Sequence, residues 1–133
     1  MNSIAVTLRN LGRTVEAREY HDRAHAIRIA LDDRSGIAES MCGIGNLHYY
    51  SGMLDSAKYY YRRALDIASG IDSLAASIPG YLNNLGNGYR EQGEMSEARN
   101  SYNESLRRAK LIGDENMRAG TLKNLGLLEL RTA

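Results

Sequence analysis

The chain has 133 residues, of which 43% are apolar and 25% charged, and these proportions are ordinary for one soluble globular domain. Seventeen Lys and Arg residues nearly balance sixteen Asp and Glu residues, so no bulk charge points to nucleic acid or to an anionic membrane surface. No apolar run approaches the roughly 20 residues that span a bilayer, and the single cysteine excludes an intrachain disulfide and favours a cytoplasmic location.

The first two predicted helices form a hairpin. The first is expected to occupy residues 1–11 and to be short, because the chain begins there, and Gly12 ends it. In the second, apolar residues recur three and four positions apart, which predicts a narrow stripe packed on neighbouring helices. The stripe comprises Ala17, Tyr20, Ala24, Ile27 and Leu31. A polar break at residues 32–36 ends this hairpin.

Five further helices are predicted, and short turns join them. They are expected at residues 35–51, 55–69, 73–92, 96–112 and 115–131. Turns this short leave no room for crossover strands, and no stretch alternates apolar and polar residues as a strand does. The predicted fold class is therefore all-α, with about seven antiparallel helices.

Pro79 interrupts the helix predicted at residues 73–92. Proline lacks an N–H and clashes with the carbonyl four residues back, so it is disfavoured inside a helix. Two outcomes are compatible with the sequence. The helix is kinked at Pro79, or it begins near Ile78.

Glycines and capping residues mark the predicted turns. The segments 70–72 and 113–114 each pair a glycine with an aspartate, which suits the end of one helix and the start of the next. We predict that these two turns are equivalent. Ser96 follows Gly93 closely and is the predicted cap of the helix at residues 96–112.

The segment Leu82–Ala98 recurs along the chain. Its apolar and small residues are found again 41 residues earlier, in a copy that contains Met41, Ile44, Gly45, His48, Gly52, Ser56 and Ala57. A helix pair of this size cannot bury its own apolar face, so neighbouring pairs must stack on it. We predict one array over residues 1–133, with repeats at about 1–33, 34–72 and 73–113 and a half repeat at 114–133.

Small residues recur where the two helices of a pair are expected to cross. On the first helices they are Ala5, Gly45, Gly86 and Gly126, and on the second helices they are Ala17, Ala57 and Ala98. A larger side chain there would push the two backbones apart. Tyr61 and Tyr102 are predicted to fill the space between successive pairs.

The repeated residues resemble the tetratricopeptide repeat pattern. In the third copy they are Leu82, Leu85, Gly86, Tyr89, Gly93, Ala98 and Tyr102, with Leu in place of the family's Trp and Tyr in place of its Phe. The period of 40 or 41 residues is longer than the usual value of about 34. In this it is similar to variants in kinesin light chains, in cell-polarity adaptors of the LGN type and in many bacterial regulators. The resemblance covers essentially the whole chain and implies a right-handed α-α superhelix, the solenoid of this family.

The resemblance also implies a peptide-binding groove, because in this family the first helix of each repeat lines the concave face. The residues predicted to bind the peptide there are Asn46, Tyr49, Tyr50, Asn83, Asn84, Asn87, Arg90, Lys123 and Asn124. Register also places Cys42, Leu127 and Leu130 on this face, with Glu39 and Arg131 at its border. An asparagine amide can both donate to and accept from an extended peptide backbone. The alternative is that several of these asparagines cap turns, contact water or bond neighbouring helices. Arg90 and Lys123 suit an acidic side chain or a C-terminal carboxylate, although a complete carboxylate clamp is not reproduced.

The last predicted helix carries a run of leucines, and no second helix follows it. The leucines are Leu122, Leu125, Leu127, Leu128 and Leu130. Solenoid arrays normally close with a polar capping helix. Either the chain is an excerpt of a longer array, or the leucines bury against another copy. We predict self-association through this helix as a homodimer.

Candidate catalytic and metal-binding residues are few. His21 and His25 lie four residues apart and could share a metal, but no convincing third ligand accompanies them. Cys42 and His48 differ by six residues, so on one helix they diverge by about 240°, too far for a catalytic dyad. We therefore expect no enzyme activity, no cofactor and no metal.

The predicted function is that of a protein–protein interaction scaffold that binds a peptide segment of a partner in the concave groove. The alternative is a sensor or regulatory segment of a larger bacterial transcriptional or signalling regulator. A DNA-binding or nucleotide-binding domain beside this segment would favour the alternative. Repeat residues specify the scaffold, and only a few groove residues specify the ligand, so the partner is not identified by the sequence.

Overall fold

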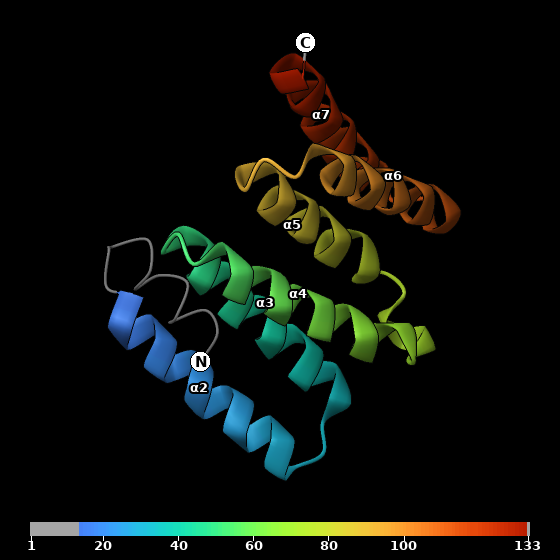
Figure 1. The fold of residues 1–133 in the computed structure, drawn as a ribbon. Coiled ribbons are helices and arrows are strands. Elements are labelled where there is room, and N and C mark those ends of the chain that lie inside the picture. Colours follow the sequence, from blue (N-terminus) through green and yellow to red (C-terminus); the bar gives the residue numbers. More distant parts are fainter. Residues whose placement is uncertain (1–13, 133) are drawn as a thin grey trace. The chain divides into compact units, whose positions relative to one another are not determined.

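A computed structural model of the protein describes residues 14–132. The α-helices are α2 (Thr14–Ala30), α3 (Arg34–Tyr50), α4 (Leu54–Ser69), α5 (Ile78–Glu91), α6 (Met95–Ile112) and α7 (Glu115–Thr132), with a 3-10 helix, η1, at Asp72–Leu74 (Figure 1). No strand occurs in residues 14–132, so the all-α prediction is confirmed. The helix predicted at residues 1–11 lies outside the described residues.

The chain divides into two compact units, Met1–Ile67 and Ala68–Ala133, and the boundary falls in the last turn of α4. The first unit contains α2, α3 and most of α4. The second unit contains α5, α6 and α7. Within the units, α2 packs on α3, α5 packs on α6, and α6 packs on α7. The arrangement of both units as one array stays a prediction.

The buried stripe of α2 is displaced from the predicted one. The two alanines of the predicted stripe are buried, but Ile27 and Leu31 are exposed. His21 is buried in their place, and the Arg28 guanidinium donates a hydrogen bond to the Gly36 carbonyl of α3 at 2.9 Å. A buried histidine and a hydrogen-bonded arginine therefore occupy part of the face that the apolar pattern assigned to Ile27 and Leu31.

Helix α6 holds the second unit together, because it packs on both α5 and α7. Its Ala98 and Tyr102 are fully buried and form a core cluster with Leu128 of α7, around which Tyr89, Met95 and Leu125 pack. Complete burial of a side chain such as Leu128 contributes about 1.5–3 kcal/mol to stability.

A tyrosine ring lies directly on the backbone of a first helix in each unit. A Cβ atom at Gly45 would come within 2.8 Å of the Tyr61 ring, and one at Gly86 within 2.6 Å of the Tyr102 ring. Both tyrosines are buried, so their rings cannot move aside cheaply. Each tyrosine therefore packs inside its own helix pair. Tyr102 additionally meets the next helix, α7, as predicted.

The second of the two alternatives for Pro79 is correct, because α5 begins at Ile78. Pro79 lies in the first turn, where the absent N–H has no helical partner to lose. The Pro79 carbonyl accepts a hydrogen bond from the Ser105 hydroxyl at 2.8 Å. This bond ties the start of α5 to α6.

The two turns predicted to be equivalent differ. Asp114 caps α7 as predicted, because its Oδ1 accepts a hydrogen bond from the Met117 N–H at 3.0 Å after Gly113 with a φ of 71°. In the turn at residues 70–72, Asp72 instead begins η1, and the residue before it makes no side-chain capping bond. The extra residues before Pro79 need a separate 3-10 turn, so this connection cannot copy the shorter one.

Ser96 is not the cap of α6. The helix begins one residue earlier, at Met95, and the N-cap residue Glu94 makes no side-chain capping bond. The Ala98 N–H donates to the Glu94 carbonyl at 3.0 Å, which makes Ser96 part of the first turn.

Substitution by alanine should change stability differently at three glycines that occupy equivalent repeat positions. Gly86→Ala places a Cβ against the Tyr102 ring and should destabilise the second unit by about 1–3 kcal/mol. Gly126→Ala meets nothing within 4 Å and should stabilise α7 by about 0.5–1 kcal/mol, because alanine favours a helix more than glycine does. Urea unfolding followed by circular dichroism measures both. Gly45→Ala should resemble Gly86→Ala, and equal effects at Gly86 and Gly126 would contradict the packing described.

Candidate functional site

The same hydrogen bond joins the second helix to the first in both units. Tyr61 Oη donates to Asn46 Oδ1 at 2.6 Å, and Tyr102 Oη donates to Asn87 Oδ1 at 2.5 Å. In each unit the asparagine directly follows the glycine on which the tyrosine ring lies. The ring and the hydroxyl of one side chain are therefore recognised by two consecutive residues of the facing helix.

Two asparagines predicted for the groove thus have a structural task. A buried hydroxyl without a partner costs about 1–3 kcal/mol, so Asn46 and Asn87 satisfy a group that water does not reach. This is the alternative in which asparagines bond neighbouring helices. Their contact with a peptide stays a prediction.

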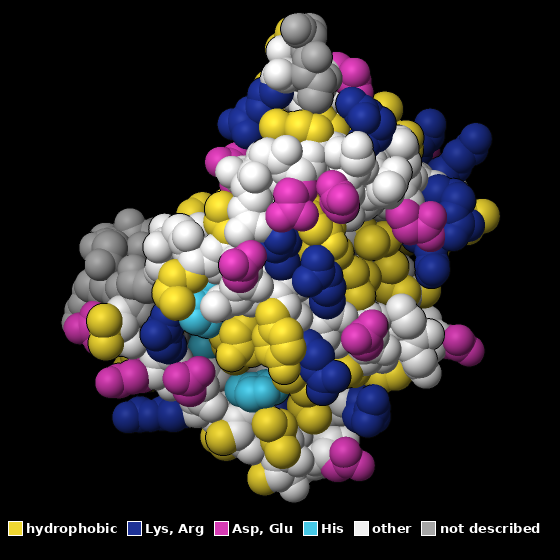
Figure 2. All heavy atoms as spheres, in the orientation of Figure 1, with side chains coloured by type: hydrophobic (Ala, Val, Ile, Leu, Met, Phe, Trp, Pro, Cys, Tyr) yellow, Lys and Arg dark blue, Asp and Glu magenta, His cyan; other side chains and the backbone are white. Residues whose placement is uncertain are grey.

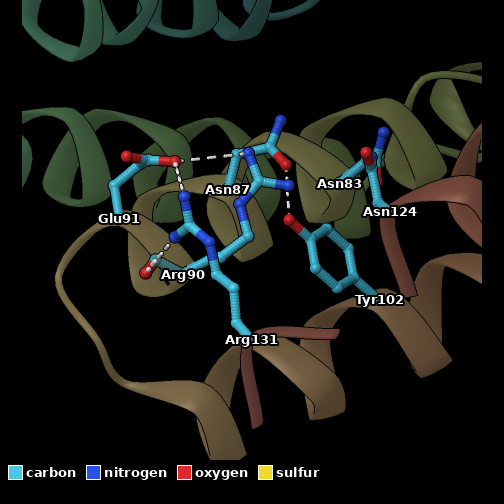
Figure 3. Close-up of polar contacts among 7 residues, drawn as sticks. All are labelled: Asn83, Asn87, Arg90, Glu91, Tyr102, Asn124 and Arg131. Atoms are coloured by element: carbon cyan, nitrogen blue, oxygen red, sulfur yellow. Dashed lines mark hydrogen bonds and ion pairs between the residues drawn. The ribbon is translucent and has the colours of Figure 1, made fainter. Parts of the chain in front are cut away.

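A third hydrogen bond between asparagines links α5 with α7. Asn124 Nδ2 donates to Asn83 Oδ1 at 2.9 Å, and both side chains are half-buried (Figure 3). An amide pair joined in this way keeps the second oxygen and further N–H groups as possible partners for a ligand. Of the predicted groove residues, these two lie on facing first helices and contact each other.

Charged residues extend this contact along α5 and α7. Arg131 donates to the Arg90 carbonyl at 3.4 Å, and its guanidinium lies 3.6 Å from the Glu91 carboxylate. Arg90 reaches the same Glu91 oxygen at 3.4 Å (Figure 3). All three distances are long for charge-assisted hydrogen bonds, which are typically about 2.7–2.9 Å. One carboxylate is therefore shared loosely by two guanidinium groups.

A pocket lies beside these charges. It has a volume of about 320 Å³ and is lined by Arg90, Leu127, Leu130 and Arg131, and we call it the α5/α7 pocket. The Arg90 side chain is only 14% exposed, and its Nε and Nη1 atoms are buried without a hydrogen-bond partner in the described part of the chain. The pocket thus combines two apolar side chains with an incompletely paired buried cation.

The remaining predicted groove residues are not among those that line the pocket. Tyr49 and Tyr50 at the end of α3 pack edge to face, with ring centroids 5.3 Å apart. Asn84 is half-buried on α5, and Lys123 is exposed on α7. The pocket is lined by Arg90, Leu127 and Leu130, which register placed on one face, and by Arg131, which register placed at its border. Glu91 was not expected beside them, and its spacing from Arg90 offered no pattern that would single it out.

The leucines of α7 face different surroundings. Leu128 is fully buried in the core of the second unit, and Leu125 packs against that core. The exposed leucines are Leu122, Leu127 and Leu130. Self-association through α7 can therefore involve only these three directly.

Gly126 lies among the exposed leucines of α7 and differs from its equivalents in the other first helices. A Cβ atom there would meet nothing within 4 Å, whereas Gly45 and Gly86 each carry a tyrosine ring. This part of α7 has the small residue of a helix-packing surface but no side chain on it from the described residues.

The histidines are engaged in packing within the first unit. His25 Nδ1 lies 2.6 Å from the Ser40 hydroxyl, and the His48 ring stacks on Tyr60 at 5.3 Å with an angle of 3° between planes. Burial lowers the pKa of both His25 and His48 from the ordinary value, which favours their neutral forms. Within residues 14–132, no three His, Cys, Asp or Glu residues are grouped in a way that could hold a metal ion.

Charge is spread over the visible surface without a dominant sign. Figure 2 shows Lys and Arg side chains interspersed with Asp and Glu side chains in both units. Among the described helices, none is long and apolar enough to cross a membrane.

The packing of small first-helix residues against second-helix tyrosines defines a helical-repeat protein, and comparison with known families identifies its class. Residues 1–69 and residues 80–115 each match the tetratricopeptide repeat family. The chain belongs to this family, whose members generally serve as protein–protein interaction scaffolds.

A solved structure with the same fold is that of BtubC (BKLC) from P. vanneervenii. The TM-score is 0.86 at 21% sequence identity, over 96% of this chain and 52% of that one. The chain therefore spans about half the length of this neighbour. No curated protein matches the sequence.

The Tyr102–Asn87 hydrogen bond can be measured by a double-mutant cycle. Asn87→Ala leaves the buried Tyr102 hydroxyl without its acceptor and should cost about 1–3 kcal/mol. Tyr102→Phe should cost less, about 0.5–1.5 kcal/mol, because the half-exposed Asn87 can turn to water. The loss of stability in the double variant should be smaller than the sum of the two single losses, because each single variant already removes the same hydrogen bond. Strict additivity in urea unfolding would contradict a bond between these side chains.

Proposed function

We propose that the protein is an interaction module that binds a peptide segment of a partner protein along the surface shared by α5 and α7. The α5/α7 pocket is the observation that carries this proposal, because it places apolar and cationic groups side by side at a concave feature. Membership of a family of interaction scaffolds supports it.

The Asn83–Asn124 pair gives this surface a way to recognise a peptide backbone. One N–H of Asn124 and the oxygen of Asn83 are used between the helices. The other polar atoms of the two amides are of the kind that an extended backbone pairs with, since a backbone offers one donor and one acceptor per residue. The pocket would then receive a side chain from the same peptide.

Residues of the first unit are assigned to the same function by repeat register. Asn46 corresponds to Asn87, and Tyr49 and Tyr50 lie at the end of α3, as Arg90 and Glu91 lie at the end of α5. We infer that both first helices offer ligand contacts. The tyrosines would supply apolar area with a hydroxyl at its edge, which suits a peptide surface.

We also infer self-association through the exposed face of α7. Leu122 is 52% exposed, and the open position at Gly126 lies four residues further on, on the same face of the helix. At Gly45 and Gly86 the same kind of position receives a bulky side chain from another helix. A second copy could place its own leucines there, in a symmetric interface.

Peptide selection tests the proposed surface. Peptides selected from a random display library on the whole chain should lose about tenfold or more in affinity on the double variant Asn83→Ala with Asn124→Ala, because each removed amide partner costs about 0.5–1.5 kcal/mol. Asn103→Ala is the matched control, since Asn103 is an exposed asparagine of α6. If the control lowers affinity and the double variant does not, the site lies on the second helices instead. Circular dichroism confirms that the variants are folded.

Light scattering after size exclusion tests self-association. Leu122→Glu should shift a dimer to monomer, because it introduces a charge into an apolar interface without touching the α5/α7 pocket. Leu111→Glu, at an exposed leucine of α6, serves as the control. A wild-type chain that is monomeric at high concentration would rule the dimer out.

A further inference from the structure

We propose that the α5/α7 pocket selects an acidic side chain next to an apolar one in the partner peptide, so that the carboxylate pairs with Arg131 and Arg90 while the apolar side chain contacts Leu127 and Leu130. This inference rests on the proposed peptide-binding function and names the class of peptide. It depends on the charges of the pocket, its lining and its size.

The charges around the pocket are mostly positive and therefore favour the binding of an anion. Two guanidinium groups, those of Arg90 and Arg131, share the single carboxylate of Glu91 at 3.4 and 3.6 Å. The Arg90 side chain is mostly buried, and burying a charge is costly unless it is well paired. A ligand carboxylate would complete the pairing that Glu91 leaves unfinished.

The two arginines would contribute in different ways. The Arg131 side chain is 48% exposed, so its guanidinium is directly open to a ligand. Arg90 lies deeper, with Nε and Nη1 buried and without a partner in the described residues. It supplies positive charge beneath the ligand in a less polar environment, where charges interact more strongly than in water.

The apolar half of the pocket comes from α7. Leu127 and Leu130 are three residues apart and therefore lie on one face of the helix. They line the same pocket as the arginines. A ligand that offers charge alone would leave these leucines in water, so an apolar neighbour beside the carboxylate is part of the recognition.

The size of the pocket favours a short element of a peptide. A volume of about 320 Å³ is at the lower end of the range for small-ligand sites, which is about 300–1,000 Å³. One apolar side chain with a neighbouring carboxylate is consistent with this volume. The remaining peptide would continue along α5 and α7 beside the Asn83–Asn124 pair.

Blocked peptide pools test the inference directly. Fluorescent hexapeptide pools with random flanks, an acetylated N-terminus, an amidated C-terminus and a central Glu-Leu are compared with pools that carry Gln-Leu or Glu-Ser. Fluorescence anisotropy on the whole chain should give about tenfold tighter binding for the Glu-Leu pool, which corresponds to one well-placed charged pair. Equal binding of the Glu-Leu and Gln-Leu pools would overturn the proposed role of the carboxylate. Equal binding of the Glu-Leu and Glu-Ser pools would overturn the proposed role of the apolar neighbour.

Variants locate the effect in the pocket. Arg131→Gln should remove the preference for Glu-Leu over Gln-Leu, and Arg131→Lys should retain part of it. Leu130→Ser should remove the preference for Glu-Leu over Glu-Ser. Arg107→Gln, at an exposed arginine of α6, should change neither preference. A preference that survives Arg131→Gln would place the acid outside this pocket and contradict the inference.

The outcome separates this inference from the proposed function. If library-selected peptides depend on Asn83 and Asn124 but ignore Arg131→Gln, peptide binding holds and the acidic specificity fails. If they ignore both sets of variants, both proposals fail. A peptide with a free C-terminal carboxylate and no acidic side chain is the last comparison. If it binds more tightly than the blocked Glu-Leu pool, the pocket binds a chain end and the proposed side-chain carboxylate is overturned.

Discussion

The contact between a tyrosine of the second helix and a glycine–asparagine pair of the first is the constraint on which the rest of the structure depends. It is present in both units, at Tyr61 over Gly45 and at Tyr102 over Gly86, and each hydroxyl is satisfied by the following asparagine. Glycine lets the ring reach the backbone, so the two helices can approach closely with the ring between them. The asparagine then removes the cost of burying the phenol hydroxyl, because an unpaired hydroxyl would offset much of the free energy gained by burying the ring.

The α5/α7 pocket, which we propose as the ligand surface, follows from a departure from this contact. In α7 the pair Gly126–Leu127 stands where α5 has Gly86–Asn87, and no described side chain lies on Gly126. Without a tyrosine hydroxyl to satisfy, asparagine is not required at position 127. Leucine is tolerated there, and its side chain becomes part of the α5/α7 pocket. The scaffold and the pocket are thus two uses of the same repeat position.

The fold could be predicted to a large extent from the sequence, because repeat spacing constrains every copy at once. The helix expected at residues 35–51 is α3 at Arg34–Tyr50, and that expected at residues 115–131 is α7 at Glu115–Thr132. The prediction fails where polar side chains determine which face of a helix is buried. On α2, His21 is buried while Ile27 and Leu31 of the expected apolar stripe are exposed. The same holds for the site. Register placed Arg90 on the face of α5 where the α5/α7 pocket lies, but the loose sharing of Glu91 between two arginines depends on distances between helices, and no periodicity encodes those distances.

A comparison between two carboxylates supports the proposal of a charged ligand at α5 and α7 rather than beside Glu104 of α6. On α6, hydrogen bonds from Arg107 and Arg108 lower the pKa of Glu104 to about 2, and the Arg108 contact measures 3.0 Å. These three charges lie on one partly exposed helix face, where water reaches and screens them and their pairing is already close. At the α5/α7 pocket the contacts to Glu91 are longer and one guanidinium is buried, so more of the positive charge is left to be paired. An arriving carboxylate would therefore gain more at the pocket than on α6, although the two places have the same number of arginines and acids.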